Sequence, residues 1–169
     1  MAKLLKEPPH KKPPWLKVKL PSHENFFFVS AVVRKLNLNT ICQSAKCPNV
    51  SECWSHRTAT FLILGDICTR DCSFCAVEHG TPGADIEQEA ARVAESVDAM
   101  ELRYVVITSV TRDDLPDGGA SHFAAVISAV RDIRPDTKIE VLIPDFKGDG
   151  EALAAVLEAG PDILNHNLE

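Results

Sequence analysis

From residue 59 onward, short continuous apolar runs alternate with segments whose apolar residues recur every three or four positions. The runs at 59–64, 104–108 and 139–143, and the start of another at 163–164, predict buried strands. The segments at 86–99 and 121–133, and a third that Asp149 caps, predict amphipathic helices. Strands of this kind separated by helices indicate an α/β fold with a parallel sheet covered by helices.

The N-terminal part of the chain has a different pattern. Residues 1–21 combine lysines with prolines and few apolar groups, which is typical of an extended, solvated tail. The alternative is a basic strap anchored by Trp15 and Leu16. Ser22 is a suitable cap for a helix whose apolar face carries Phe26, Val29, Val33 and Leu36. A loop-rich stretch with three cysteines follows this helix.

Polar and reactive residues follow the predicted strands directly. The second group of cysteines begins just after the first strand, and further polar residues follow the other strands, at 109–114, 144–146 and 165–167. In a βα barrel the carboxyl ends of the strands form one rim, which carries the active site. The sequence therefore predicts an active site at this rim.

Composition and charge narrow the class of protein. The chain has 169 residues, of which 45% are hydrophobic and 25% charged, and its formal net charge is −6. This is ordinary for a globular protein, and it lacks the basic balance expected for a partner of nucleic acid. The apolar runs are too short to cross a membrane. Because no signal or transit peptide is recognisable, we expect a reducing, cytoplasmic location.

The six cysteines fall into two triplets, Cys42-x4-Cys47-x5-Cys53 and Cys68-x3-Cys72-x2-Cys75. Disulfides would need an oxidising compartment, and a zinc site made from four of the thiols would leave two without a role. Neither triplet has the C-x2-C-x2-C-x3-C-P run of two-cluster ferredoxins. Three thiolates suit a 4Fe–4S cluster with one iron open to a substrate or cofactor. We therefore predict two such clusters.

These motifs resemble a known superfamily. The segment GDICTRDCSFCAV (65–77), which follows the first strand, resembles the cluster motif of the radical S-adenosylmethionine (SAM) enzymes. Together with the upstream triplet in CQSAKCPNVSECW (42–54), it closely resembles the lipoyl synthase family. Other matching stretches are KPPWLKVKLP (12–21), TSVTRDDLPDGGASHF (108–123), EVLIPDFKGD (140–149) and HNLE (166–169).

The resemblance implies a domain organisation. Residues 59–169 are expected to form a partial TIM-type (βα) barrel, with parallel strands and outer helices, that comprises the first four βα units. Residues 1–58 are expected to form a cysteine-rich extension before it. A complete member of the family continues through further βα units to an R-S-S-Y motif that is absent here, so we expect a fragment.

The resemblance also implies the chemistry. A cluster on Cys68, Cys72 and Cys75 would bind S-adenosylmethionine and generate a radical, and these three cysteines are the predicted catalytic residues. A second cluster, held by the upstream cysteines, would donate two sulfur atoms to an octanoyl chain on a lysine of a lipoyl carrier domain. The implied partners are that octanoylated carrier and an electron donor such as flavodoxin or ferredoxin. The alternatives are another radical sulfur-inserting enzyme, such as biotin synthase, and a non-catalytic metal-binding scaffold.

Supporting roles in cofactor binding are assigned more loosely. The predicted contacts with S-adenosylmethionine come from Phe74, Ser109, Arg112, Asn165 and Glu169, with Asp113 as a further candidate. The alternatives are loop packing for the aromatic ring and capping of the next helix for the two carboxylates at positions 113 and 114. The glycines at 118 and 119 suit a turn at a helix start, and the histidine at 166 is as well explained by hydrogen bonding as by catalysis.

Overall fold

The computed structural model describes residues 20–83 and 86–168, and its central feature is a five-stranded sheet. The strand order is β1-β2-β5-β6-β7. The bounds are β1 (Asn39–Thr40), β2 (Thr60–Ile63), β5 (Tyr104–Ser109), β6 (Lys138–Ile143) and β7 (Ile163–His166). β1 pairs antiparallel with β2, and all other neighbouring strands are parallel. The parallel sheet predicted from the apolar runs is confirmed.

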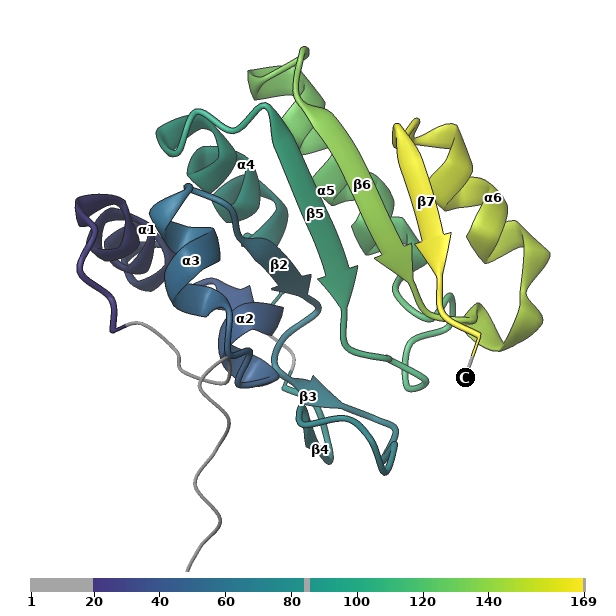
Figure 1. Ribbon diagram of the computed structural model, residues 1–169. Coiled ribbons are helices and arrows are strands. Elements are labelled where there is room, and N and C mark those ends of the chain that lie inside the picture. Colours follow the sequence, from purple (N-terminus) through teal and green to yellow (C-terminus); the bar gives the residue numbers. More distant parts are fainter. Residues whose placement is uncertain (1–19, 84–85, 169) are drawn as a thin grey trace, which may run out of the picture.

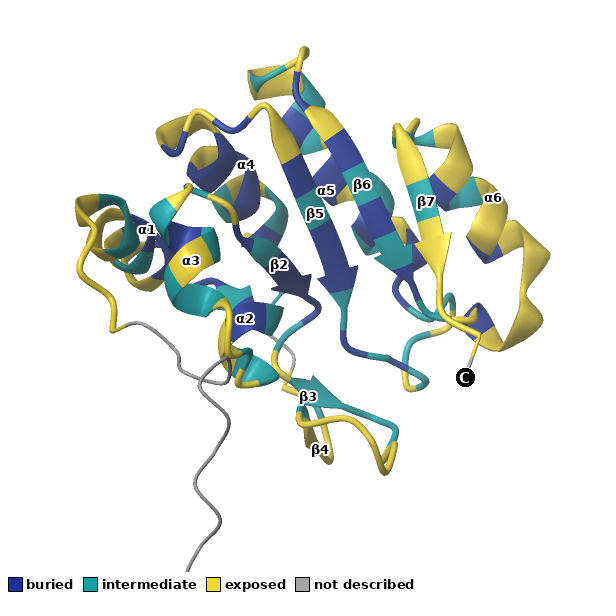
Figure 2. Cartoon of the chain, in the orientation of Figure 1, coloured by how far each residue is buried: buried dark blue, intermediate teal, exposed yellow. Residues whose placement is uncertain are grey.

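Three helices cover one face of this sheet (Figure 1). They are α4 (Glu89–Ala99), α5 (Ala120–Ile133) and α6 (Gly150–Glu158), and α5 packs against both others. The strand residues that face them are buried, as alternate positions of β6 show at Ile139, Val141 and Ile143 (Figure 2). Within the described residues, no helix covers the other face of β5, β6 and β7 (Figure 1). This one-sided cover matches a section of a barrel wall.

The N-terminal helices pack beside the edge of the sheet. They are α1 (Glu24–Lys35), α2 (Ile41–Ser44) and α3 (Val50–Ser55). The predicted cap of α1 at Ser22 is wrong, because the side chain of His23 accepts the N–H of Asn25 instead. Trp54 is buried and stacks near Phe26, with ring centroids 5.4 Å apart. These residues join the core of the sheet, so the division at 58/59 stays a prediction.

The first cysteine triplet lies mostly on short helices, which corrects the expected loop. The side chain of Thr40 accepts the N–H of Gln43 at 3.3 Å, which caps α2 and gives Cys42 a helical position. Cys53 lies in α3, and Cys47 lies between the two helices. Capping by a threonine is a local signal that outweighed the turn-forming residues of this stretch.

The first residues of α4, α5 and α6 set the ends of the loops that follow the parallel strands. Asp149 caps α6 as predicted, since its Oδ1 accepts the N–H groups of Glu151 and Ala152. α4 begins at Glu89 rather than at residue 86, because residues 87–88 form a turn. α5 begins after Gly119, whose φ of 93° is left-handed. None of the helices in the described ranges is long and apolar enough to cross a membrane.

Predictions for residues 1–19 and for Glu169 lie outside the described residues. They include the tail or strap with its two anchors and one of the expected contacts with S-adenosylmethionine.

Candidate active site

The second cysteine triplet lies at the carboxyl end of β2, below the arrowheads of the parallel strands (Figure 1). Leu64 and Gly65 leave the strand with positive φ angles, and the chain then forms β3 (Ile67–Cys68). β3 pairs with β4 (Glu78–His79), so the segment from Cys68 to Cys75 is a loop closed at its base. The predicted position at the rim is therefore confirmed.

The three thiols of this segment have different surroundings. The sulfur of Cys68 is half-buried and accepts the backbone N–H groups of Arg70 at 3.4 Å and Thr111 at 3.3 Å. Cys72 and Cys75 are exposed, and the N–H of Cys75 donates to the carbonyl of Cys72 at 3.0 Å. The sulfur of Cys68 is thus fixed against the body, whereas the other two cysteines are exposed to solvent.

The thiols of the upstream triplet lie near one another. Burial raises the pKa of the Cys53 thiol, and the neighbouring Cys42 and Cys47 raise it further. The N–H of Cys47 donates to the carbonyl of Cys42 at 3.0 Å. These helices therefore bring the three cysteines into one neighbourhood, as their spacing predicts.

Within 20–83 and 86–168, no three His, Cys, Asp or Glu side chains are gathered closely enough to hold one metal ion. A 4Fe–4S cluster binds each thiolate through a different iron, so its ligands stand further apart than those of a single ion. The donor set, six free cysteines in two triplets, has the chemistry of cluster ligation.

Two of the predicted cofactor contacts lie at the end of β5 and on the loop that follows it. The Oγ of Ser109, at the end of the strand, is buried and has no hydrogen-bond partner among the described residues. Arg112 is also buried, and its guanidinium is used within the protein. It donates to Asp114 at 2.8 Å and to the carbonyl of Leu64 at 3.1 Å, and the bond with Asp114 raises the pKa of the arginine.

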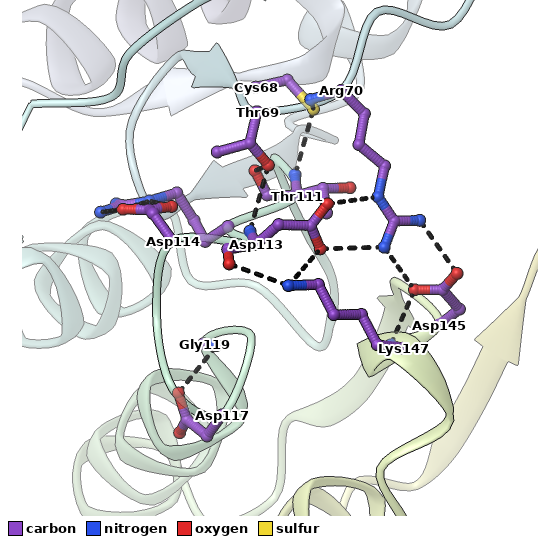
Figure 3. Close-up of polar contacts among 11 residues, drawn as sticks. Cys68, Thr69, Arg70, Thr111, Asp113, Asp114, Asp117, Gly119, Asp145 and Lys147 are labelled. Atoms are coloured by element: carbon purple, nitrogen blue, oxygen red, sulfur yellow. Dashed lines mark hydrogen bonds and ion pairs between the residues drawn. The ribbon is translucent and has the colours of Figure 1, made fainter.

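The two carboxylates at positions 113 and 114 do not cap α5, so that alternative is wrong. Asp117 does so instead, accepting the N–H of Gly119 at 2.9 Å (Figure 3). It also accepts the N–H of Ser121, at 2.7 Å. Asp113 turns toward the cysteine segment, and Asp114 pairs with the neighbouring arginine. Asp117 and Gly119 thus form the start of α5, which matches the prediction that Gly118 and Gly119 make a turn at a helix start.

Arg70 joins the cysteine segment to the loops after β5 and β6 (Figure 3). Its guanidinium donates to both carboxylate oxygens of Asp113, at 2.7 and 2.9 Å. It also donates to both oxygens of Asp145, at 2.9 and 2.8 Å. These bonds raise the pKa of Arg70, lower the pKa of Asp113 and bring the pKa of Asp145 to about 2.

The remaining site residues that the sequence predicts are spread along the rim. Phe74 is 69% exposed, which leaves its ring unpacked and does not support the loop-packing alternative. Asn165 lies on β7 and donates to Glu140 of the neighbouring strand. His166 contacts the carbonyl of Ile143 at 2.9 Å, which bears out the hydrogen-bonding role.

Sequence reasoning missed the residues that support the loops. Arg70 and Asp145 are single charged residues inside matching stretches, and only their position in those stretches hints at a role. Glu89 is 4% exposed, accepts the N–H of Leu64 at 2.7 Å and contacts His122 at 2.7 Å. The available signal was an acidic residue four positions before Val93, on the apolar face of α4.

Comparison with known proteins places the chain in a family. The model of the radical SAM superfamily matches residues 62–169, which contain the rim, the cysteine segment and the parallel strands. The chain belongs to the radical SAM superfamily. A model of the N-terminal domain of lipoyl synthase matches residues 2–47 of this radical SAM chain.

Curated relatives of the chain are lipoyl synthases. One from Chloroflexus aggregans is 55% identical over 159 residues, covering 94% of this chain and 52% of the relative. One from Oleidesulfovibrio alaskensis is 57% identical over 157 residues, covering 93% and 54%. One from Laribacter hongkongensis is 54% identical over 160 residues, covering 94% and 51%. The resemblance to this family is confirmed, and the chain spans about half the length of these relatives.

Membership of the radical SAM superfamily implies a 4Fe–4S cluster and S-adenosylmethionine as cofactors. The residues present suit both. Cys72 and Cys75 of the cysteine segment are exposed and accessible to a cluster, and the Oγ of Ser109, without a partner among the described residues, lies at the end of the adjacent strand β5. An unsatisfied buried hydroxyl at a rim is a place where a polar ligand gains a hydrogen bond.

Proposed function

We propose that this chain carries the S-adenosylmethionine-cleaving part of a lipoyl synthase. The reaction would be the radical insertion of two sulfur atoms into an octanoyl chain attached to a lysine of a lipoyl carrier domain. The single observation that carries the proposal is the presence of two cysteine triplets, one at the carboxyl rim of the parallel sheet and one in the preceding helices. A radical SAM enzyme that only cleaves the cofactor has no use for the second triplet.

The rim residues would bind and orient S-adenosylmethionine. Cys68, Cys72 and Cys75 would hold a 4Fe–4S cluster, which supplies the electron for homolytic cleavage of the cofactor. The Oγ of Ser109 is free to donate to or accept from a polar group of the cofactor. The exposed ring of Phe74 suits stacking on the adenine.

The other predicted contacts lie in two places. Asn165 is on the inner face of β7, where its amide reaches Glu140, so both side chains offer polar groups to a ligand inside the barrel. Arg112 is enclosed by its own bonds, and its part in this proposal is to hold the loop that follows Ser109. A role for Glu169 remains part of the proposal from the sequence alone.

The upstream triplet would hold a second 4Fe–4S cluster that serves as the sulfur donor. Its support is geometric, since Cys42 and Cys53 lie on the consecutive helices α2 and α3 and the N–H of Cys47 donates to the carbonyl of Cys42 at 3.0 Å. The short helices α2 and α3 carry two of these ligands on backbone that is tied into the core through Trp54. This packing would anchor the second cluster to the N-terminal helices beside β2.

The partners follow from this chemistry. The substrate would be an octanoylated lipoyl carrier protein or domain, and the electron donor a small redox protein such as flavodoxin or ferredoxin. Six unpaired thiols that bind iron are compatible with a reducing compartment, so we propose a cytoplasmic location.

Metal analysis and spectroscopy test the proposal. After anaerobic reconstitution with iron and sulfide, we expect roughly eight irons per chain, the content of two 4Fe–4S clusters. Addition of S-adenosylmethionine should change the electron paramagnetic resonance spectrum of the reduced protein, and dithionite should then yield 5′-deoxyadenosine. Zinc without iron, or no spectral change on addition of the cofactor, would overturn the assignment.

A further inference from the structure

Arg70 occupies an unusual position between the first two cysteines of the cysteine segment. Its guanidinium bridges Asp113, after β5, and Asp145, after β6, with two hydrogen bonds to each (Figure 3). Paired N–H donors of arginine match both oxygens of a carboxylate, which makes such contacts directional as well as strong. A single side chain therefore connects the loops after three neighbouring parallel strands, β2, β5 and β6.

The residues just before Arg70 are attached to the same rim. The N–H and the hydroxyl of Thr69 both donate to the carbonyl of Thr111, at 3.0 and 2.9 Å. The N–H of Asp113 donates to the hydroxyl of Thr69 at 3.1 Å. Arg70 is the next residue and the last before Cys72 that contacts these loops in the described structure. It therefore ends the anchored part of the segment.

Beyond this anchor the two remaining thiols depend on the backbone that leads to them. Cys72 and Cys75 are exposed, and the hydrogen bond between them lies within the segment itself. If the guanidinium released its carboxylates, the described contacts left to hold the chain from Arg70 onward would lie near β4, where Glu78 and His79 pair with β3, His79 contacts Asp71 and Val77 packs against the core.

The charged groups around Arg70 indicate that its side chain anchors the loop and does not bind a ligand. Lys147 donates to the carbonyl of Asp113 at 2.9 Å and lies 3.7 Å from its carboxylate. This group of four charged side chains thus contains two cations, Arg70 and Lys147, and two carboxylates, Asp113 and Asp145. The guanidinium of Arg70 already donates to both carboxylates, so it has no free pair of N–H groups with which to bind the carboxylate of a ligand.

We propose that Arg70 is a positioning residue that locks the cysteine segment to the rim, holding Cys68, Cys72 and Cys75 in place for the cluster before it forms. This inference rests on the proposed function, because it assigns the segment to cluster binding. Its physical content is a restraint on the loop, which exists with or without metal.

Hydrogen exchange on the cluster-free chain tests the restraint directly. In Arg70→Ala, the backbone amides of residues 66–75 should exchange roughly tenfold faster than in the parent chain. The reason is that the free energy of local opening falls when the paired bonds of Arg70 no longer have to be broken. Arg70→Lys keeps the charge but cannot bridge two carboxylates with paired donors, so its exchange rate should be intermediate. Asp145→Asn removes one half of the bridge and serves if the alanine variant does not fold.

Arg131→Ala is the matched control. Arg131 also contacts a carboxylate, Asp162, and donates to the carbonyl of Thr137 at 2.6 Å, but these residues precede β6 and β7 at the opposite end of the strands. Its loss should leave exchange in 66–75 unchanged. Equal exchange in Arg70→Ala and in the parent chain would overturn the inference.

A second readout links the restraint to the cofactor. In reconstituted protein, Arg70→Ala should need roughly tenfold more S-adenosylmethionine than the parent chain to produce half of the spectral change, because a misplaced ligand set weakens binding. Arg70→Lys should recover part of this loss, and Arg131→Ala should match the parent. A parent chain that takes up no iron would refute the proposed function, while the exchange experiment would still decide the inference.

Discussion

Leu64 and Gly119 are packed so closely that a Cβ on Gly119 would lie 2.3 Å from Cδ1 of the leucine. Both residues have left-handed backbone conformations, with φ angles of 69° and 93°. The first turns the chain out of β2 toward the cysteine segment, and the second starts α5. The path of the cysteine segment is therefore fixed by a contact between residues 55 positions apart in the sequence.

Gly119→Ala should lower the free energy of unfolding by about 2–4 kcal/mol, since it adds both a steric clash and a left-handed alanine. Gly160→Ala is the control, because Gly160 also has a positive φ, of 72°, but a Cβ there would meet nothing within 4 Å. We expect a loss of about 1 kcal/mol for the control, from backbone strain alone. Urea unfolding followed by circular dichroism measures both, and equal losses would contradict the packing explanation.

Glu89→Ala should destabilise the chain by about 2–3 kcal/mol, because the buried N–H of Leu64 and the ring of His122 would both lose a charged partner. Glu95→Ala, an exposed substitution on the same helix, should change stability by less than about 0.5 kcal/mol. Thermal unfolding of the two variants compares them. If Glu89→Ala were as stable as Glu95→Ala, the buried carboxylate would not support the loop.

The ion pair of Arg70 and Asp145 should make stability depend on acid pH. The bonds from Arg70 lower the pKa of Asp145 from 3.8 to about 2, so the folded state favours the ionised carboxyl. Its contribution is therefore complete above pH 3.8 and is lost as the pH falls through about 2. Since the side chain is 47% exposed, solvent limits this contribution to less than about 1 kcal/mol.

Asp145→Asn should accordingly be slightly less stable than the parent chain at pH 6, with a difference that shrinks between pH 4 and pH 2. Urea unfolding at several pH values measures the difference. Asp136→Asn removes the same charge from another exposed position and should show no such convergence. A constant difference between Asp145→Asn and the parent at all pH values would argue against the ion pair as its source.

Substitutions in the two cysteine triplets should separate the two clusters. Cys72→Ala should abolish formation of 5′-deoxyadenosine while retaining the iron of the upstream cluster, about four atoms per chain. Cys47→Ala should do the reverse, keeping formation of 5′-deoxyadenosine while losing the iron of the upstream cluster, about four atoms per chain. Iron analysis and product quantification by mass spectrometry distinguish the variants. Identical behaviour of both would show that the triplets do not have separate tasks.

Local sequence patterns predicted the elements of this fold well where one signal dominated. The apolar run YVVIT became β5, and the spacing of Phe123, Val126, Ile127 and Val130 marked the buried face of α5. The cap at Asp149 was found because a short polar side chain before an apolar segment satisfies free N–H groups. Errors occurred where two local signals competed, as at Ser22 and His23, which lie next to each other before α1.

The sequence predicted where the cysteines of the candidate site lie, but it did not predict the residues that support the loops around them. Cysteine spacing identified all six thiols, and the alternation of strands and helices assigned one triplet to the rim. The partners of Arg70 lie 43 and 75 positions away, at Asp113 and Asp145, and no periodicity connects such residues. Arg112 seemed suited to a ligand from its sequence position, yet it is buried and bonded within the protein.

The sequence by itself determined the α/β class, the order of the elements and the two sets of thiols, since each depends on the spacing of residues close along the chain. The tertiary structure decided which charged side chains meet, where the cysteine segment is anchored and which rim hydroxyl is buried without a partner in the described part of the chain. Those outcomes depend on parallel strands bringing their carboxyl ends to one edge of the sheet, where loops distant in sequence come within hydrogen-bonding distance.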